Sequence, residues 1–382
     1  MLPRLYNGFN FANHYAPGTC LGTLNLCKSC KVKEERNGEY ILELEAIVND
    51  PTALQLASQR IIQAKPNPHD ALQYFEIQST RKGLDGIIRA SAKHCRNFAF
   101  QFVSEGDMTY IDNPDHFTLN PQGWWNKLFN DGYINGYASA DDCPYTFVSD
   151  ITATADCYLG FNQPVTIGDI LGGKEGSMID LFHGEFKYNN YLIQYLSSRG
   201  ETTNYKLRYG KNISTAEQSE NCLMAYSHVL PYGQVATTSG RNIILYADVF
   251  EIPNNDCTTK KVYPLDCTDA LSTFQVNTQQ TDWYVAPRAA MTAYAAQYAS
   301  ANNVGKINVS ITVDVRSELD AMQQLKLCDM VKVELETLGI TTTAKIVSAT
   351  YDVLLERWDK LIVGMIPISF SDIILDKRRV QL

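Results

Sequence analysis

Apolar and polar residues alternate along much of the first hundred positions, which predicts short antiparallel strands. Residues 24–48 form two alternating runs around the dipeptide Asn37-Gly38, a strong hairpin signal. Further strand-like runs follow within 72–92, after a proline-containing loop. Short strands at this spacing predict a small antiparallel β-barrel over residues 1–104.

The same alternation returns near the C-terminus. It begins with INVSITVDV at 307–315 and continues through three more strand-like runs. These runs predict a second small antiparallel β-barrel over 305–370, and residues 371–382 are expected to be a tail or linker. The chain is therefore predicted to be mainly β with some α (α+β), with two barrels flanking a mixed α+β middle region over 105–304.

The middle region is predicted to contain a long helix and a hairpin. An alanine-rich run, with Met291 and Tyr298 at helical spacing, predicts a helix over 282–301. Two alternating runs within 185–210 predict an antiparallel hairpin that turns at 197–200. One buried and one solvated face are expected for it.

A glycine-rich stretch precedes this hairpin and raises the question of a phosphate-binding loop. Gly172, Gly173 and Gly176 are close together. However, no Gly-Lys-Ser/Thr ending follows, and no strand–GxGxxG–helix pattern surrounds them. A plain tight turn is the better interpretation.

Length and charge limit the classes of function. A chain of 382 residues suggests two or three domains, and its 22 tyrosines favour β structure. A net charge of −9 argues against a nucleic-acid-binding surface, although DNA could pass acidic walls without binding. Neither a signal-peptide pattern nor an apolar run of membrane-spanning length is seen, so a soluble protein made in the cytosol is expected.

The ten cysteines do not form a recognisable metal or redox motif. Cys27 and Cys30 make one CxxC, but a zinc ribbon needs a second one. This CxxC lies within a strand-like run, where the two thiols are expected on opposite faces. Cys257 and Cys267 flank a polar loop and could pair only under oxidising conditions.

Other candidate groups are weighed against ordinary structural roles. Two residue pairs are considered as catalytic candidates: His183 with Glu185, and His94 with Cys95. A histidine that caps a helix-to-strand turn is the better interpretation of His183, and direct contact between His94 and Cys95 is not expected on a strand. The remaining candidates are loop acids and scattered histidines: Asp141, Asp142, Asp150, His14, His69, His116 and His228.

Trp124 and Trp125 could stack on sugars or bases, although anchoring a helix in a core is the more common use of such residues. Because no motif assembles, no catalytic, cofactor-binding or metal-binding residue is predicted.

Four segments together resemble the hub proteins of phage tails. They are KVKEERNGEYILELE at 31–45, FEIQSTRKGLDGIIRASAKH at 75–94, the glycine-rich stretch and strands at 171–212, and LCDMVKVELETLGITTTAKIVSATYDVLLERWDKLIVG at 327–364. The family is the N-terminal structural region of tail-associated lysins, also described as prophage endopeptidase tail or phage minor structural proteins. Cys328 stands where the family usually has Gly before Asp329, and Asn189 stands where Asp is common. These departures concern local turn geometry.

The resemblance implies a structural, non-enzymatic role at the tail tip or baseplate of a virion. It implies a homotrimeric ring in which two barrels per subunit give pseudo-six-fold symmetry. Such a ring would dock on the distal tail protein or the six-fold tail tube, and the tape-measure protein and DNA would leave through its channel. A lysin or receptor-binding domain would follow in a longer relative.

Two other functions remain open at the level of sequence. One is a cell-wall peptidase acting on peptidoglycan, with His183 as the residue to test. The other is a carbohydrate-binding tail module that uses Trp124 and Trp125.

Overall fold

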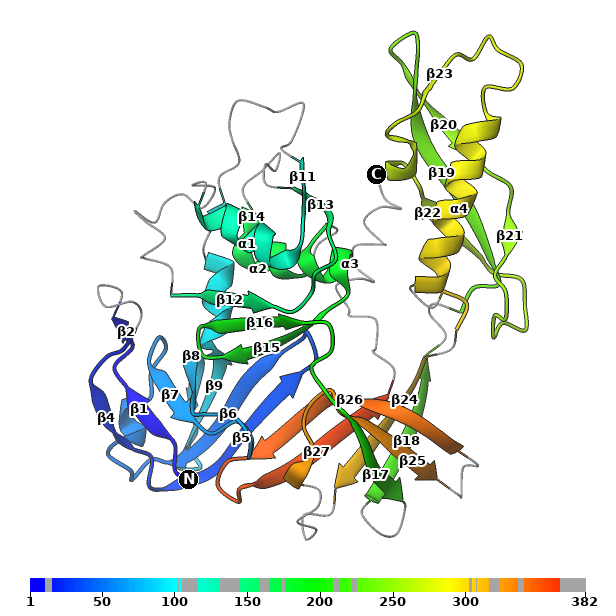
Figure 1. Ribbon diagram of the computed structural model, residues 1–382. Coiled ribbons are helices and arrows are strands. Elements are labelled where there is room, and N and C mark those ends of the chain that lie inside the picture. The colour runs from blue at the N-terminus through cyan, green and yellow to red at the C-terminus, as the bar shows by residue number, and fades with distance from the viewer. Residues whose placement is uncertain are drawn as a thin grey trace. The chain divides into compact units, whose positions relative to one another are not determined.

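The computed structural model describes most of the chain (Figure 1). The described residues are 1–10, 16–101, 103–104, 116–130, 144–158, 165–173, 176–208, 213–221, 225–301, 304–306, 308–315, 323–335 and 340–364. The chain divides into two compact units. The first combines Met1–Glu217 with Ile311–Leu382, and the second is Gln218–Ser310.

The N-terminal half of the first unit is an antiparallel sheet, as the alternating pattern predicts. Its strands run in the order β5-β6-β9-β8-β7-β1-β4. Their bounds are β1 (Arg4–Tyr6), β4 (Cys20–Thr23), β5 (Cys27–Glu35), β6 (Tyr40–Ile47), β7 (Ile61–Ala64), β8 (Gln73–Lys82) and β9 (Ile87–His94). The predicted hairpin is β5 with β6, and Asn37 takes a left-handed φ of 53° in its turn. Leu42 and Leu44, two residues apart, are almost fully buried, so the period-2 pattern sets which face enters the core.

The C-terminal half adds six strands to the same sheet. They are β17 (Thr202–Arg208), β18 (Ile213–Asn221), β24 (Asn308–Val315), β25 (Met330–Leu335), β26 (Ile340–Asp352) and β27 (Arg357–Gly364). The junction is an antiparallel pairing of β26 with β5, from Ser348 opposite Glu35 to Asp352 opposite Lys31. The two ends of the chain therefore form one thirteen-stranded sheet, and the pairings of the described strands do not close into a barrel.

The middle region of the first unit is built on a small three-stranded sheet in the order β12-β16-β15. Strands β15 (Glu185–Asn189) and β16 (Leu192–Leu196) are antiparallel, and β12 (Thr146–Ser149) is parallel to β16. Helices α1 (Pro121–Asn130), α2 (Ile167–Leu171) and α3 (Met178–Phe182) belong to this region. Capping side chains explain where the two short helices begin, because Thr166 accepts the N–H of Asp169 and Ser177 accepts that of Asp180.

The predicted hairpin over 185–210 is wrong in its pairing. Residues 185–196 form a hairpin by themselves, because Asn190 takes a left-handed φ of 51° and turns the chain. The following strand, β17, pairs in parallel with β25 of the large sheet. The alternation correctly marked strands, but it contains no information on which strand each one joins.

Short elements complete the described residues of the first unit. They are β2 (Phe9–Asn10) with β3 (Ala16–Pro17), β10 (Val103–Ser104) with β14 (Val165–Thr166), β11 (His116–Leu119) with β13 (Ala155–Tyr158), and the 3₁₀ turns η2 (Ala53–Gln55) and η3 (Cys95–Gln101).

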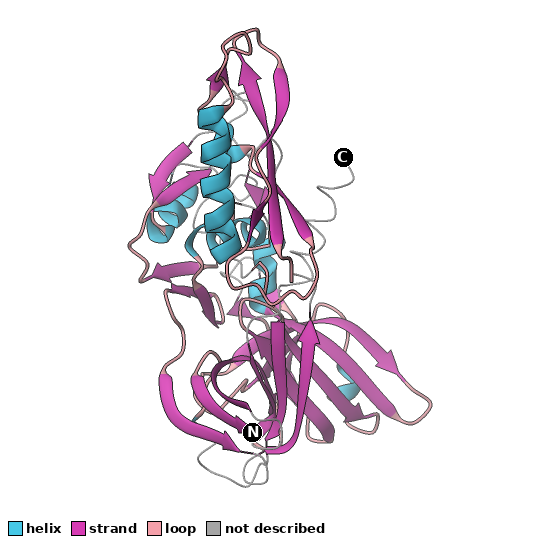
Figure 2. Cartoon of the chain, turned by 90° about the vertical axis from the view of Figure 1, so that its right-hand side faces the viewer, coloured by secondary structure: helices cyan, strands magenta, loops and turns pink. Residues whose placement is uncertain are grey.

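The second unit packs one helix on one small sheet (Figure 2). Strand β19 (His228–Thr237) is central and pairs with β20 (Asn242–Tyr246), β21 (Phe250–Glu251), β22 (Val262–Asp266) and β23 (Gln275–Val276). A 3₁₀ turn, η5 (Asp269–Leu271), and helix α4 (Val285–Ala301) cover one sheet face. The helix predicted over 282–301 is thus observed, beginning three residues later. Its buried positions Met291, Ala295 and Ala299 are four residues apart and lie on one helical face.

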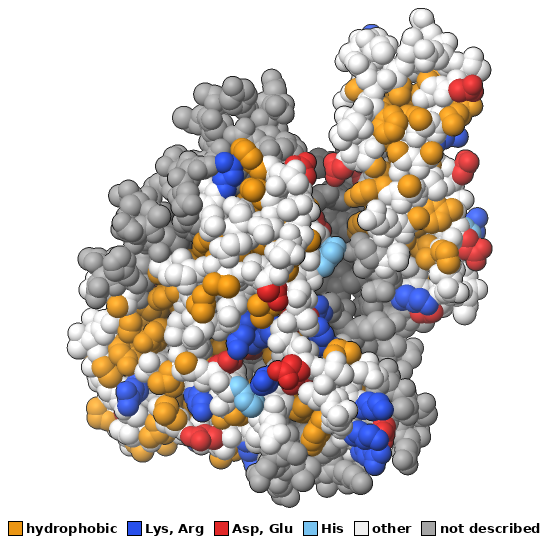
Figure 3. Space-filling view, in the orientation of Figure 1, with side chains coloured by type: hydrophobic (Ala, Val, Ile, Leu, Met, Phe, Trp, Pro, Cys, Tyr) orange, Lys and Arg blue, Asp and Glu red, His pale blue; other side chains and the backbone are white. Residues whose placement is uncertain are grey.

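Charges of both signs are interspersed on the face of the molecule shown in Figure 3. The basic side chains of the described residues do not gather there into a continuous surface, which agrees with the acidic composition.

Candidate functional site

A notable feature of the first unit is a group of buried and half-buried charges where three segments of the chain meet. Glu34 comes from β5, Glu185 from β15, and Lys345 from β26. Arg36 follows β5, and Arg199 lies in the turn that leads from β16 to β17. We call these five residues the charged cluster. It connects both halves of the large sheet to the middle region.

Arg199 makes the central contact of the charged cluster. Its two terminal nitrogens donate to the two carboxylate oxygens of Glu34 over 2.6 and 3.2 Å, and one also donates to the carbonyl of Phe186. The side chains of Arg199 and Glu34 are only 7% and 10% exposed. Burial alone lowers the pKa of Arg199, but the charge and hydrogen bonds of Glu34 raise it above its ordinary value. The pair is therefore a buried, bidentate ion pair.

Glu185 is the second carboxylate of the charged cluster and is almost completely buried. Its carboxylate contacts Arg36 Nε at 2.7 Å and Lys345 Nζ at 2.6 Å, and it accepts the backbone N–H of Arg199 at 2.8 Å. Burial raises the pKa of Glu185, but the hydrogen bonds from Lys345 and the Arg199 N–H, with the Arg36 charge, lower it overall. This carboxylate is ionised and fully engaged.

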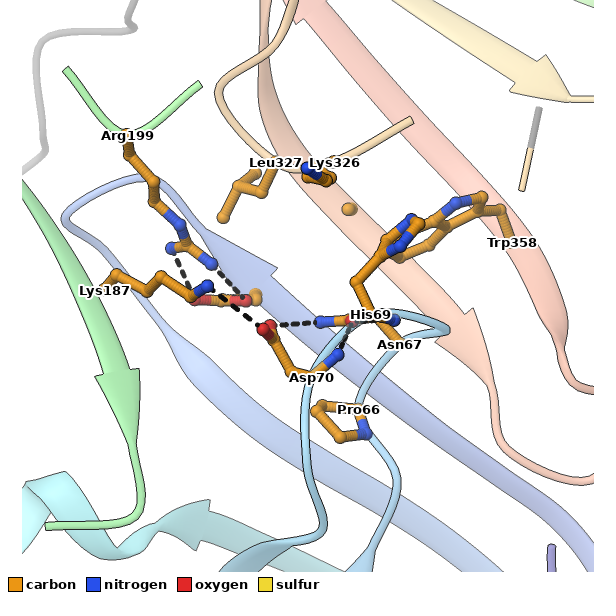
Figure 4. Close-up of a pocket in the computed structure, with 11 residues that line it drawn as sticks. Pro66, Asn67, His69, Asp70, Lys187, Arg199, Lys326, Leu327 and Trp358 are labelled. Carbon is orange, nitrogen blue, oxygen red and sulfur yellow. Dashed lines mark hydrogen bonds and ion pairs between the residues drawn. The ribbon is translucent and has the colours of Figure 1, made fainter. Parts of the chain in front are cut away.

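A pocket of about 180 Å³ lies beside Arg199 (Figure 4). Asp70 forms part of its wall and accepts from Asn67 Nδ2 at 2.7 Å and pairs with Lys187 Nζ at 3.2 Å. Burial raises the pKa of Asp70, but the Asn67 hydrogen bond and the charge of Lys187 lower it overall. The two acids of this wall, Glu34 and Asp70, are paired with Arg199 and Lys187, and these pairs hold the wall together. His69, an exposed residue, also lines the pocket, and its backbone N–H donates to Asn67.

Acid is expected to destabilise the protein through these carboxylates. Glu185 and Asp70 have folded-state pKa values below their ordinary values of 4.5 and 3.8, so the stability they contribute is present above about pH 4.5 and is lost as pH falls further. Each contributes a slope of up to about 1.4 kcal/mol per pH unit. Urea unfolding from pH 7 to pH 3 measures this slope.

The variant Glu185→Gln provides the comparison for this experiment. It is expected to be less stable at pH 7 and to show a shallower loss below pH 4.5, because one of the linked protons is gone. An unchanged slope in the variant would contradict the assignment.

Two asparagine side chains connect the middle region to the large sheet. Each side-chain amide accepts a backbone N–H and donates to a backbone carbonyl of the other segment, as a peptide group would. Asn190 accepts the N–H of Tyr74 at 2.9 Å and donates to the carbonyl of Leu72 at 3.1 Å. Asn37 accepts the N–H of Phe186 and donates to the carbonyl of Gly184. Both asparagines have left-handed backbone conformations, which Asn tolerates better than most residues.

The structure gives His183 and Glu185 different surroundings and different partners. His183 is the exposed residue that ends α3, with a left-handed φ of 53°, and its backbone N–H donates to Ile179. The carboxylate of Glu185 is taken by Arg36, Lys345 and Arg199. The predicted role of His183 as a cap is confirmed.

His94 and Cys95 are in contact, contrary to the expectation for neighbouring strand residues. Strand β9 ends at His94 and a 3₁₀ turn begins at Cys95, so the thiol lies 3.9 Å from Nε2 of the ring. Burial lowers the pKa of His94 and raises that of the Cys95 thiol. Both groups therefore stay neutral, and the pair lacks the thiolate that a nucleophile requires.

Cys27 and Cys30 are also placed differently from the expectation of opposite faces. A bulge between Cys27 and Ser29 takes up one residue, so Cys27 lies opposite Ala46 and Cys30 opposite Leu44, on one face of β6. Burial raises the pKa of Cys27 to about 12 and also raises that of Cys30. Both are free thiols, as are Cys257 and Cys267.

The tryptophans of α1 are core residues. Trp124 is fully buried, and Trp125 is stacked on Phe147 with ring centroids 4.9 Å apart. The helix-anchor interpretation is confirmed, and neither ring offers an open face for a sugar.

The remaining candidates have local roles or lie outside the described residues. Asp150 accepts from the backbone N–H and hydroxyl of Ser197. His228 is hydrogen-bonded to Ser227. Gly173 and Gly176 have φ values of 96° and 73° and serve the turn between α2 and α3. His14, Asp141, Asp142 and the side chain of His116 fall among residues that are not described.

Among the described residues, no group of three His, Cys, Asp or Glu side chains is arranged to hold a metal. None of the described helices is both long and apolar enough to cross a membrane.

The charged cluster was missed at the level of sequence, although one signal pointed to it. Cys30, Val32 and Glu34 share one face of β5, and all three are buried. A glutamate on the apolar face of an alternating strand requires a buried partner. The identity of that partner, 165 residues away, comes only from the fold.

Several solved phage tail proteins have this fold. The prophage tail protein gp18 from Listeria monocytogenes EGD-e has a TM-score of 0.57 at 12% identity, covering 100% of this chain and 99% of that one. The tail protein from Neisseria meningitidis MC58 has a TM-score of 0.55 at 10% identity and covers 97% and 98%. The prophage MuSo2 43 kDa tail protein from Shewanella oneidensis has a TM-score of 0.51 at 11% identity and covers 95% and 98%.

No curated protein matches the chain. Residues 201–363 match the prophage endopeptidase tail family, and the predicted resemblance of the chain to phage tail proteins is confirmed.

Proposed function

We propose that this protein is a non-enzymatic structural component of a phage or prophage tail tip or baseplate. Three copies form a ring that caps the tail tube and lines the channel through which DNA leaves. Its neighbours in the virion are the distal tail protein or the six-fold tail tube, and the tape-measure protein.

One observation carries this proposal: the pairing of β26 with β5. It places the N-terminal and C-terminal sets of strands side by side in one sheet, and in this proposal each set acts as one β body of the subunit. Three subunits then offer six, which suits contact with a six-fold partner ring. In this proposal each set of strands closes further, into a barrel-like body, when the ring assembles.

The state of the charged side chains supports a structural role. The buried acids of the charged cluster are paired with basic side chains, and Asp70 is paired with Lys187 beside it. A hydrolytic site would instead present an acid, base or nucleophile toward substrate. The charged cluster holds three segments of the first unit together, which is a structural role.

Light scattering on the purified chain, alone and mixed with the distal tail protein of the same phage, tests the proposal. The expected result is a trimer, or a monomer that becomes a trimer when the partner ring is added. Negative-stain images of that complex should show a closed ring. A stable dimer that persists with the partner would overturn the proposal.

Incubation of the purified protein with peptidoglycan distinguishes the structural role from the alternative function, a cell-wall peptidase. Release of soluble fragments that is lost in His183→Ala would favour a peptidase. The proposal expects no release from either protein.

A further inference from the structure

His94 is buried at the place where the large sheet contacts the β15–β16 hairpin. It lies at the end of β9, with less than 2% of its surface exposed, and its ring stacks on Tyr40 with centroids 4.3 Å apart. Phe75 contacts it edge-on, and Tyr188 of β15 lies 6.2 Å away. The ring therefore contacts both the sheet and the hairpin.

Both ring nitrogens of His94 are used, which defines a single neutral form. Nδ1 accepts the backbone N–H of Arg96 at 3.1 Å, so it carries no proton. Nε2 then carries the proton and donates to Gln73 Oε1 at 3.0 Å. A second proton on Nδ1 would face the Arg96 N–H and break that hydrogen bond.

The two partners of His94 are also the residues that hold the hairpin. Gln73 Oε1 accepts the N–H of Asn190 at 2.5 Å, and Gln73 Nε2 donates to Asn189 Oδ1 at 3.0 Å. Arg96 places its guanidinium 4.5 Å from the ring centroid of Tyr188 and donates to the carbonyl of Gly38. Any rearrangement of His94 therefore reaches the hairpin through both of its hydrogen-bond partners.

The surroundings offer no compensation for a charged ring. The groups that face it are Tyr40 from β6, Gln73 and Phe75 from β8, Tyr188 from β15, and Cys95 and Arg96 from the 3₁₀ turn. Among the described residues in contact with the ring, none is a carboxylate, and the one charged neighbour is the cation Arg96. Burial and this cation lower the pKa of His94 well below 6.5.

We propose that His94 is an acid-sensitive latch: its protonation releases the turn end of the β15–β16 hairpin from β8, while the charged cluster keeps the other end attached. The released segment comprises the turn at Asn190 and the adjoining ends of both strands. The charged end stays in place at mild acidity because the carboxylate of Glu185 remains ionised there.

The size of the effect follows from linkage. Below pH 6.5 the open state takes up a proton that the closed state excludes. The equilibrium constant for closing therefore falls by a factor of about 1 + 10^(6.5 − pH). Stability of the closed latch is therefore full above about pH 7 and falls as pH decreases. Between pH 7.5 and pH 5.0 the open population is expected to rise up to about 30-fold.

Hydrogen exchange of the full chain, followed by mass spectrometry at pH 7.5 and 5.0, tests the latch. After correction for the intrinsic pH dependence of exchange, peptides over 72–75 and 188–193 should lose protection by up to about 30-fold. Peptides over 30–34 and 42–46, in β5 and β6, should keep theirs. Equal protection of the hairpin at both pH values overturns the proposal, and so does a uniform loss over the whole chain.

Two variants assign the effect to His94. His94→Gln keeps a donor toward Gln73 but cannot titrate, so its hairpin should exchange equally at both pH values. His69→Gln removes an exposed histidine and should behave like the parent. A pH response that persists in His94→Gln, or disappears in His69→Gln, overturns the assignment. If His94→Gln does not fold, the proposal is still tested by the parent and His69→Gln. In both proteins, acid should reduce protection in the hairpin peptides and not in the β5 and β6 peptides.

Discussion

Replacing Arg199 by Met is expected to lower the free energy of unfolding by about 3–5 kcal/mol, because it leaves the carboxylate of Glu34 buried without its partner. Glu34 is 10% exposed and receives both terminal nitrogens of Arg199. The Phe186 carbonyl loses a donor as well. Urea denaturation of the parent and the variant at pH 7 measures the difference.

A double-mutant cycle distinguishes pairing from simple loss of packing. In Glu34→Gln/Arg199→Met the buried charge is removed along with its partner, so the double variant should lose less stability than the sum of the two single variants. Arg199→Lys is the matched control, because it keeps the charge but not the fork of two donors. A loss below about 1 kcal/mol in Arg199→Met would mean that water reaches Glu34 and the ion pair is not buried.

Replacing Gly200 by Ala is expected to cost at least about 3 kcal/mol, at the upper end of overpacking substitutions. A Cβ at this position would lie 2.0 Å from the carbonyl oxygen of Cys328 and 2.5 Å from the N of Asp329. These are backbone atoms, which cannot move aside as a flexible side chain does. The contact also lies beside the start of β17, so the pairing of β17 with β25 should weaken. Thermal unfolding followed by circular dichroism gives the comparison.

Gly173→Ala is the control for this substitution. Its φ of 96° is unfavourable for alanine, but apart from its chain neighbours no heavy atom of the described residues lies within 4 Å of the added Cβ. Only the backbone cost of about 1–2 kcal/mol remains. If both variants lose the same stability, the close approach at Gly200 is not the cause.

Cys328 lies in the loop that the Gly200 turn approaches closely, and its backbone conformation is unusual. It has a left-handed φ of 74° and is almost fully buried against the turn that contains Gly200. The resemblance places glycine at this position, and the backbone conformation gives the physical reason, since glycine adopts positive φ without strain. Asp329 stabilises the loop by accepting the N–H groups of Glu201 and Lys326.

Much of the secondary structure could be predicted from the residues alone. The hairpin at 24–48 follows from alternation on both sides of Asn37-Gly38, and α4 follows from apolar residues four positions apart. These signals are local, because the period of a strand or helix is set by backbone geometry within a few residues. Roles that depend on local chemistry, such as the cap at His183 and the core position of Trp124, were predicted for the same reason.

Local signals failed where a single residue changed the geometry. The left-handed Asn190 divides the predicted strand at 185–196 into two, and the bulge after Cys27 moves both thiols of the CxxC to one face. The 3₁₀ turn at Cys95 brings its thiol to His94. Each case changes the direction of side chains without a change in the alternation of the surrounding sequence.

The sequence by itself therefore determined the class of structure, most of the strands, the helix α4 and the family resemblance. Only the tertiary structure decided that β5 joins β26, that β17 joins β25, and that Arg199 meets Glu34. Strand alternation fixes which face is buried but does not select a partner strand, since every amphipathic strand presents a similar edge. The partners of the buried charges are likewise chosen by the pairing of segments more than 100 residues apart, which no local pattern encodes.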